Sequence, residues 1–178
     1  MTGTGLQGPG IGGTLRLTWV ADHLAHILDD SQAEEAIGTW TGLACPDRGL
    51  QIGEDVNNAT LARLAGQGEV ADLAWEPPAD LTAEHGQLCV AAIQAHRSGR
   101  LEEGEDLWEQ VVAVWSHAWA ANYKVPELMQ SAGLTRFSPA KPQRWVIASY
   151  GHHTGPHGLP APHIHNIVIP ALTAAARE

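Results

Sequence analysis

The chain has 178 residues, 44% of them hydrophobic and 17% charged, and this composition is typical of one globular domain. Twenty acidic against ten basic residues give a net charge of −10, which disfavours nucleic-acid binding over the whole surface, because Lys and Arg supply most nonspecific affinity for phosphate. No run of about eighteen apolar residues and no signal peptide is apparent, so we expect a cytoplasmic protein without a membrane partner.

The N-terminal part of the chain divides into a glycine-rich arm and the start of a domain. Residues 1–13 contain six glycines and are predicted to form a flexible arm, and residues 14–178 a single domain. Leu and Trp alternate with polar residues over 14–20, as in a half-buried strand. Helical patterns follow over 21–30 and over 31–39, where Ser and Glu are spaced as in a capping box.

The middle of the chain predicts a helix, a strand and a sharp turn. Asn58 is placed to cap a helix over 59–65. Val70 to Trp75 is an apolar run of strand length, and Pro77 and Pro78 end it because proline cannot donate a backbone hydrogen bond. We therefore expect the chain to leave the sheet at this point.

Two long helices are predicted next, over 81–98 and 101–123. Gly99 is suited to end the first of them. In the second, aromatic and apolar residues recur every three or four positions, and we predict that this stripe packs in the core rather than stacking on a ligand. Its members are Trp108, Val112, Trp115 and Trp119.

Cysteine usage carries little information on a site. Cys45 and Cys89 stand far apart and lack the spacing of metal ligands. Two reduced structural thiols are the expectation for a cytoplasmic protein, and a disulfide between them is left open.

The C-terminal part carries five of the ten histidines, on and between two predicted strands, 144–150 and 163–170. Alternate residues of a strand share a face, so His163 and His165 project together, and His152 joins Tyr150 if the first strand continues. Antiparallel neighbours then bring three imidazoles to one point. Three neutral nitrogen ligands with open positions are the pattern of a catalytic metal site, and Zn, Mn, Ni, Co, Fe or Mg are candidate ions.

These residues carry a resemblance to a known family. His152, ten intervening residues and then His163-Ile164-His165 resemble the metal-binding signature of conjugative DNA relaxases, members of the histidine-hydrophobic-histidine (HUH) endonuclease superfamily. Tyr150 and Pro160 match an aromatic residue and a proline that often accompany this signature. The resemblance covers about thirty residues closely and roughly a hundred loosely. His153 and His157 are alternates for the third ligand.

The resemblance implies a reaction on single-stranded DNA. In relaxases, the three histidines hold a divalent ion on the scissile phosphate, and a tyrosine attacks to form a phosphotyrosine. That tyrosine usually lies near the N-terminus, whereas this chain has only Tyr123 and Tyr150. Both are therefore the candidate nucleophiles, in an arrangement unlike the usual one. A basic group precedes the histidine strands: Lys124, Arg136, Lys141 and Arg144.

Three hypotheses follow from these patterns. The first is a metal-dependent relaxase-like enzyme that nicks or rejoins single-stranded DNA. The second keeps the metal and the fold but acts on a small molecule, in keeping with the acidity and the absent early tyrosine. The third is a metal-stabilised interaction domain, in which four protein ligands would close the site. The expected fold is α+β, an antiparallel sheet of about four or five strands covered by helices, with the two His-bearing strands central.

Overall fold

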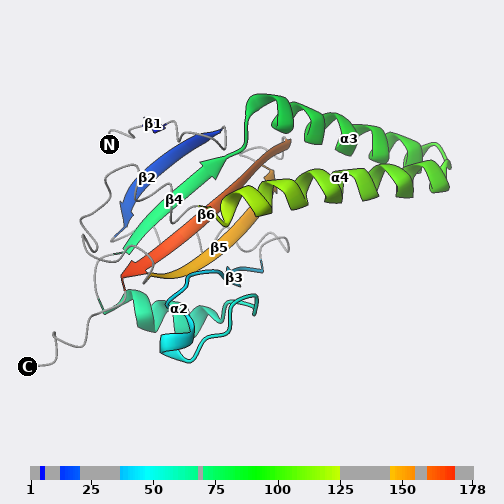
Figure 1. Ribbon diagram of the computed structural model, residues 1–178. Coiled ribbons are helices and arrows are strands. Elements are labelled where there is room, and N and C mark those ends of the chain that lie inside the picture. The colour runs from blue at the N-terminus through cyan, green and yellow to red at the C-terminus, as the bar shows by residue number, and fades with distance from the viewer. Residues whose placement is uncertain are drawn as a thin grey trace, which may run out of the picture.

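The structure is a computed structural model that describes residues 5–6, 13–20, 37–67, 70–124, 145–154 and 160–170. Its centre is one antiparallel sheet in the order β1-β2-β4-β6-β5-β3 (Figure 1). The strands are β1 (Gly5–Leu6), β2 (Thr14–Val20), β3 (Thr39–Trp40), β4 (Val70–Glu76), β5 (Trp145–Thr154) and β6 (Pro160–Pro170). The helices are α2 (Asn58–Ala65), α3 (Ala79–Arg97) and α4 (Leu101–Asn122), with a 3-10 turn η2 (Pro46–Arg48).

This architecture confirms the α+β class with an antiparallel sheet. Four strands are long, and β1 and β3 contribute two residues each at the edges. Strand β6 lies between β4 and β5, and β5 lies between β6 and the short β3. The two His-bearing strands are therefore inside the sheet, as expected, although β3 covers β5 over only two residues.

Most predicted elements agree with the structure to within a few residues. The strand over 14–20 is confirmed, and β4 ends one residue before Pro77. The cap of α2 was assigned one residue too late: Asn57, not Asn58, accepts a hydrogen bond from the Thr60 amide at 3.0 Å. At the turn after α3, Gly99 has a φ of 76°, a conformation that glycine adopts without strain.

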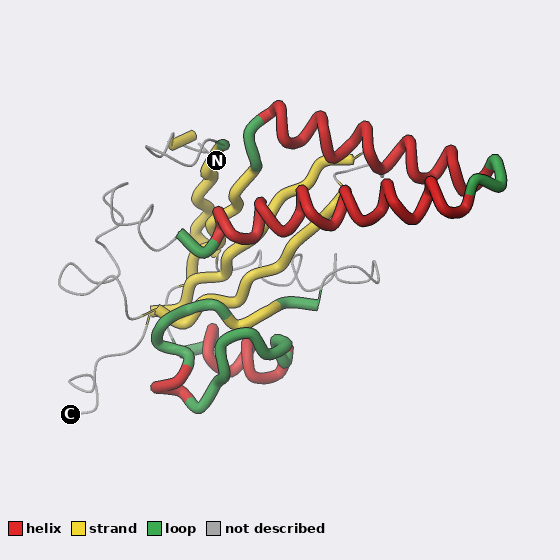
Figure 2. The backbone as a smooth tube through the Cα atoms, turned by 45° about the vertical axis from the view of Figure 1, so that its right-hand side comes forward, coloured by secondary structure: helices red, strands yellow, loops and turns green. Residues whose placement is uncertain are grey.

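The two faces of the sheet are covered differently, because alternate residues of each strand point to opposite sides. One face, here called the α2 face, packs against α2 and the segment around β3, with a core of Trp40, Leu61, Leu64, Val146, Ala148, Tyr150, Ile167 and Ile169. The other, the hairpin face, packs against α3 and α4, with a core of Leu73, Trp75, Ala118, Trp145, Ile147, Ile164 and Val168. Figure 2 shows the helices on opposite sides of the strands.

The antiparallel hairpin of α3 and α4 extends beyond the end of the sheet (Figures 1 and 2). Trp115 and Trp119 pack against the hairpin-face core, as predicted. The prediction was wrong for the outer half of the stripe, because Trp108 is 37% and Val112 61% exposed. The same helical stripe loses its cover where the helix passes the last strand, and sequence periodicity does not reveal where a sheet ends.

The packing of α4 explains why a glycine, Gly151, stands directly before the two histidines of β5. A Cβ atom there would lie 2.7 Å from Cζ2 of Trp115 and 3.0 Å from Cζ2 of Trp119. Both contacts are shorter than packed carbon atoms tolerate. The absence of a side chain therefore lets α4 lie close against β5.

A buried polar network fixes the end of α4 to the sheet. Asn122 and Asn166 exchange two side-chain hydrogen bonds of 2.9 and 2.8 Å. Asn166 also donates to the Leu73 carbonyl at 3.1 Å and accepts from the Ser149 hydroxyl at 2.7 Å. Because every amide atom of Asn166 is paired, the network holds helix and strands in one arrangement.

Several expectations concern segments outside the described residues. These are the helix over 21–30, residues 31–36 of the next predicted helix, His157, and the basic residues Arg136, Lys141 and Arg144. The end of that next helix was wrong, because residues 37 and 38 are not helical and Thr39 begins β3. Within the predicted arm, Gly5 and Leu6 pair with Arg16 and Leu15 of β2. Cys45 and Cys89 are both free thiols. None of the described helices is both long enough and apolar enough to cross a membrane.

Candidate metal centre

Three histidines come together on the α2 face, at the end of the sheet that α2 does not cover. The register of β5 and β6 places His152 directly opposite His163, and Tyr150 opposite His165. Opposed residues of antiparallel strands project to the same side. The bulge between His152 and Thr154 lies beyond this pair, so the alternation predicted from the sequence is kept up to His152.

The spacing of the three imidazoles suits one shared ion. The ring centres are 5.1 Å apart for His152 and His163, 5.4 Å for His152 and His165, and 5.0 Å for His163 and His165. Imidazoles that bind one zinc ion through nitrogens at 2.0–2.1 Å have ring centres roughly 5 Å apart. All three side chains are partly exposed, so the group is accessible from solvent.

Two of the three rings are oriented by hydrogen bonds through Nδ1. His165 donates from Nδ1 to Oδ2 of Asp72 at 2.8 Å, and His163 donates from Nδ1 to the Ala161 carbonyl at 2.8 Å. A carboxylate or a carbonyl accepts only from a protonated nitrogen, so each bond leaves Nε2 as the nitrogen with a lone pair. Carboxylates and carbonyls that orient a histidine in this way are the usual outer partners of metal ligands.

The protonation of His163 also suits a ligand. Burial lowers the pKa of His163 below the ordinary histidine value of 6.5, and the neighbouring His165 acts in the same direction. The Ala161 carbonyl, Glu76 and Asp72 oppose the shift without overcoming it. A histidine must be neutral to bind a metal, and the lowered pKa favours the neutral form near pH 7.

The three rings are not oriented as the ligands of a bound metal ion would be. No three His, Cys, Asp or Glu side chains among the described residues are arranged to hold a metal ion. The rings of His152 and His163 are stacked with an interplanar angle of 15°, whereas ligands of one ion must each aim a nitrogen at it. The donor types and spacing therefore fit a divalent ion, and binding requires a ring rotation.

The alternate third ligand, His153, lies on the other side of the sheet. Its Nδ1 is 3.1 Å from Nε2 of His85 in α3, and its ring centre is 4.4 Å from that of Trp115. These contacts place His153 on the hairpin face, so His152 and His153 do not serve the same site. The structure thus separates His153 from the three histidines.

The two tyrosines are not placed as attacking groups in this structure. Tyr150 is 2% exposed, its hydroxyl has no hydrogen-bond partner among the described residues, and burial raises its pKa to about 12. Tyr123 follows the last residue of α4, and the adjacent Asn122 bonds to Asn166 on the hairpin face. Tyr150 is therefore packed in the core, and the end of α4 lies across the sheet from the histidines.

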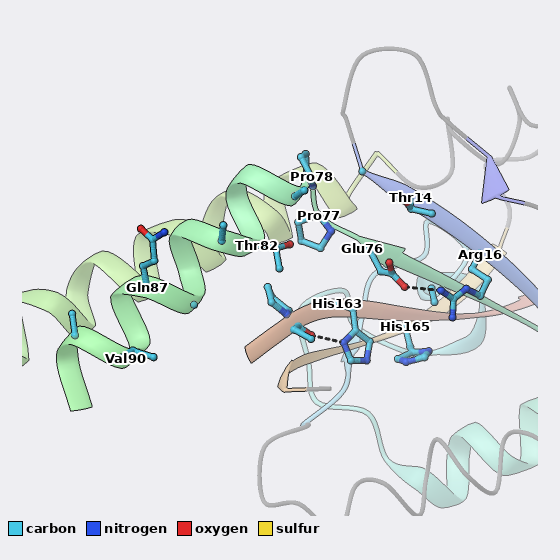
Figure 3. A pocket seen from close by; sticks show the side chains of 18 of the residues that line it. Thr14, Arg16, Glu76, Pro77, Pro78, Thr82, Gln87, Val90, His163 and His165 are labelled. Atoms are coloured by element: carbon cyan, nitrogen blue, oxygen red, sulfur yellow. Dashed lines mark hydrogen bonds and ion pairs between the residues drawn. The ribbon is translucent and has the colours of Figure 1, made fainter. Parts of the chain in front are cut away.

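A broad cleft of about 1370 Å³ opens beside His163 and His165. Strands β2 and β4 form one wall, Pro77 and Pro78 the corner, and α3 the opposite wall (Figure 3). Arg16 and Glu76 lie within it as an ion pair of 3.0 Å. The histidines therefore stand at a concave surface large enough for an organic substrate.

Asp72 is a functional candidate that the sequence reasoning missed. It is 2% exposed and joins His165 from the neighbouring strand β4. The sequence did hold a signal, because a single carboxylate within an apolar strand is rarely buried without a partner. The identity of that partner required the pairing of β4 with β6.

Comparisons of the chain with models of known families, with curated proteins and with solved structures give no match. The resemblance to relaxases therefore depends on the motif formed by His152, His163 and His165.

Proposed function

We propose that this protein is a divalent-metal enzyme with a three-histidine site, similar to that of relaxases, and that its substrate contains a phosphodiester. The observation that carries the proposal is the meeting of three imidazoles from β5 and β6, with ring centres 5.0 to 5.4 Å apart, two of which (His163 and His165) line an open cleft. Three unrelated surface histidines would not be expected to gather at one place on one face of the sheet. Two of them are also held in orientation by hydrogen bonds through Nδ1.

Each residue of the site has a defined task in this proposal. His152, His163 and His165 hold the ion through neutral nitrogens, and Asp72 keeps His165 in the tautomer that presents Nε2. A bound divalent ion supplies Lewis-acid polarisation of a phosphoryl oxygen and a fixed template for the substrate. The cleft wall of β2, β4 and α3 then positions the remainder of the substrate.

Nicking through a phosphotyrosine is the less supported form of this chemistry. A nucleophile must reach the scissile phosphate within hydrogen-bond or attack distance. Tyr150 is buried in the α2-face core, and α4 ends on the opposite face from the histidines. These positions favour the second candidate, a metalloenzyme of the same architecture that acts on a small phosphodiester without a covalent tyrosine intermediate.

Metal content tests the proposal most directly. We expect about one equivalent of divalent metal in the purified chain by mass spectrometry, and less than about a tenth of it in His163→Ala and His165→Ala. His117→Ala is the matched control, because His117 is exposed on α4 and should leave the metal unchanged. Circular dichroism checks that the variants stay folded. Stoichiometric metal in both site variants would refute the proposal.

Substrate assays separate the candidates once metal is established. A single-stranded oligonucleotide tests nicking, and bis(p-nitrophenyl) phosphate tests hydrolysis of a small phosphodiester. Oligonucleotide cleavage that stops in Tyr123→Phe or Tyr150→Phe would favour the nicking form. Hydrolysis that persists in both variants and stops in His165→Ala would favour the second candidate. A metal with four protein ligands and no activity would instead indicate an interaction domain.

A further inference from the structure

Arg16 of β2 and Glu76 of β4 form an exposed cross-strand ion pair at the wall of the cleft. Arg16 Nη2 lies 3.0 Å from Glu76 Oε1, and the side chains are 59% and 46% exposed. Water screens such exposed charges, so the pair contributes little to the stability of the fold.

The register of the sheet directs Arg16 toward the histidines. Arg16 is opposite Ala74 in β4, and Ala74 is opposite His165 in β6. Adjacent strands are about 4.8 Å apart, so Arg16 begins roughly 10 Å from His165, with only the methyl group of Ala74 between them. Figure 3 shows Arg16, Glu76, His163 and His165 on the same side of these strands.

Arg16 is also the one Lys or Arg among the described residues that line the cleft. Glu76 is the one acidic residue among them. An anion that enters the cleft therefore meets a single cation, and meets it within reach of the histidines. In a chain with a net charge of −10, Arg16 is the one Lys or Arg of the described cleft lining that can attract an anion.

The opposite wall of the cleft has a different character. The residues of α3 that line it are neutral and mostly small, and they include Gln87 and Gln94, seven positions apart, with Val90 and Ala91 between them. Amide groups offer hydrogen bonds without charge, and the aliphatic residues offer an apolar surface. This wall suits the neutral organic part of a ligand, such as a nucleoside, and not a second anionic group.

We propose that Arg16 is a substrate-binding residue that holds the phosphodiester oxygens of a nucleotide ligand, and that Glu76 competes for the guanidinium until the ligand displaces it. The guanidinium fork matches two phosphate oxygens, whereas Glu76 offers a partner that is easily exchanged in water. The nucleoside part lies against the first turns of α3, at Thr82 and Ala83, which line the cleft next to the Pro77–Pro78 corner. The choice of ligand class rests on the proposed function, and the Arg16–Glu76 exchange is an addition to it.

The test compares a charged ligand with its neutral copy. Thymidylyl-thymidine and its uncharged methylphosphonate analogue are titrated by calorimetry into the full chain, with metal content measured on each sample. We expect the wild type to prefer the charged dinucleotide, and Arg16→Gln to weaken that ligand about tenfold while leaving the analogue unchanged. Glu76→Gln should tighten the charged ligand several-fold, because it removes the competing carboxylate.

Two further variants act as controls. Arg63→Gln makes the same charge change on an exposed residue of α2, and should bind both ligands as the wild type does. Arg16→Lys keeps the charge but loses the fork, and should recover only part of the affinity. Equal binding of the charged dinucleotide by wild type and Arg16→Gln would overturn the inference. So would a wild type that binds the neutral analogue equally well.

Failure of the inference is distinguishable from failure of the proposed function. Arg16-dependent binding in a protein without metal would refute the metal enzyme and support the role of Arg16. Stoichiometric metal that depends on His163 and His165, with no effect of Arg16→Gln on dinucleotide binding, would support the metal site and overturn the role of Arg16.

Discussion

His152 and His153 are neighbours in the chain, yet the sheet places them in different environments. His152 faces the open end of the α2 face, with His163 and His165 about 5 Å away. His153 faces the hairpin, where it contacts His85 and Trp115. The face of the sheet therefore decides the role of each histidine. His152 lies with the other two histidines of the site, whereas His153 packs against the hairpin.

The two faces also differ in how their polar groups are satisfied. On the hairpin face, Asn166 makes side-chain hydrogen bonds to Asn122, Ser149 and Leu73, and nothing is left for a ligand. On the α2 face, His163 and His165 use Nδ1 for the protein and leave Nε2 as the lone-pair nitrogen. A fully paired network stabilises a fold. Histidines that use one ring nitrogen for the protein and keep a lone pair on the other can bind a ligand.

Substitution of the adjacent histidines is the sharpest way to break this comparison. His152→Ala should lose most of the bound metal and retain its stability. His153→Ala should retain the metal and lower the free energy of unfolding by about 1–2 kcal/mol, because buried His85 loses its hydrogen-bond partner. Metal analysis and urea denaturation of both variants give the answer. Equal loss of metal in the two variants would contradict the separation of the faces.

Asn166→Ala should cause the largest loss of stability on the hairpin face. The change removes the hydrogen bonds that Asn166 makes in a buried place with Asn122, Ser149 and the Leu73 carbonyl, at a cost of about 2–3 kcal/mol. Chemical denaturation measures it, and Asn57→Ala serves as a control for the loss of one exposed cap. Stability within about 0.5 kcal/mol of the wild type would show that the network does not hold α4.

Asp72→Asn should weaken the metal site without unfolding the protein. Loss of the carboxylate that orients a ligating histidine lowers metal affinity by roughly 10- to 100-fold. Competition with a fluorescent chelator measures the affinity, and Asp47→Asn, on the exposed turn η2, is the matched control. Unchanged affinity in Asp72→Asn would mean that His165 is oriented without its help.

Acid should destabilise the hairpin face through His85. Burial lowers the pKa of His85 below 6.5, and the nearby His153 adds to the shift. The unfolded chain then binds a proton before the folded protein does, so the free energy of unfolding falls as the pH falls below 6.5. The slope is at most about 1.4 kcal/mol per pH unit for one proton. Denaturation between pH 7.5 and 5 should show a shallower slope in His85→Gln, and identical slopes would exclude this role.

Tyr150→Phe should have the smallest effect. The hydroxyl of Tyr150 is buried without a hydrogen-bond partner among the described residues, so its removal should leave stability unchanged or raise it by up to about 1 kcal/mol. Thermal unfolding measures the change, and metal content should stay the same. A marked loss of activity with normal stability would return Tyr150 to the list of catalytic residues.

The grouping of the histidines could be predicted from the sequence because a strand has a period of two residues. That period alone placed His163 and His165 on one face and His152 with Tyr150, and the register of β5 and β6 agrees. The same alternation predicts that His153 points to the other face. The sequence does not say whether the strand stays regular through Gly151, so His153 is still an alternate ligand when the sequence is considered alone.

The length of the sheet and the neighbours of each strand could not be predicted from the sequence. The helical period of α4 predicted one stripe of Trp108, Val112, Trp115 and Trp119, and only the position of the sheet exposes the first two. In the sequence, Arg16 has the pattern of an ordinary exposed cation on a strand. Asp72 is a single acidic residue within an apolar run. Their relation to His165 appears only when β2, β4 and β6 are adjacent.

The sequence by itself determined the local elements of this protein, since strand alternation, prolines, glycines and helix periodicity act over a few residues. It also determined which histidines can share a face. Only the tertiary structure decided that the three imidazoles meet beside a cleft, that Asp72 orients His165, and that Tyr150, although it is opposite His165, has its hydroxyl buried in the core. The physical reason is that these relations join residues up to 93 positions apart, and strand pairing, not local preference, brings such residues together.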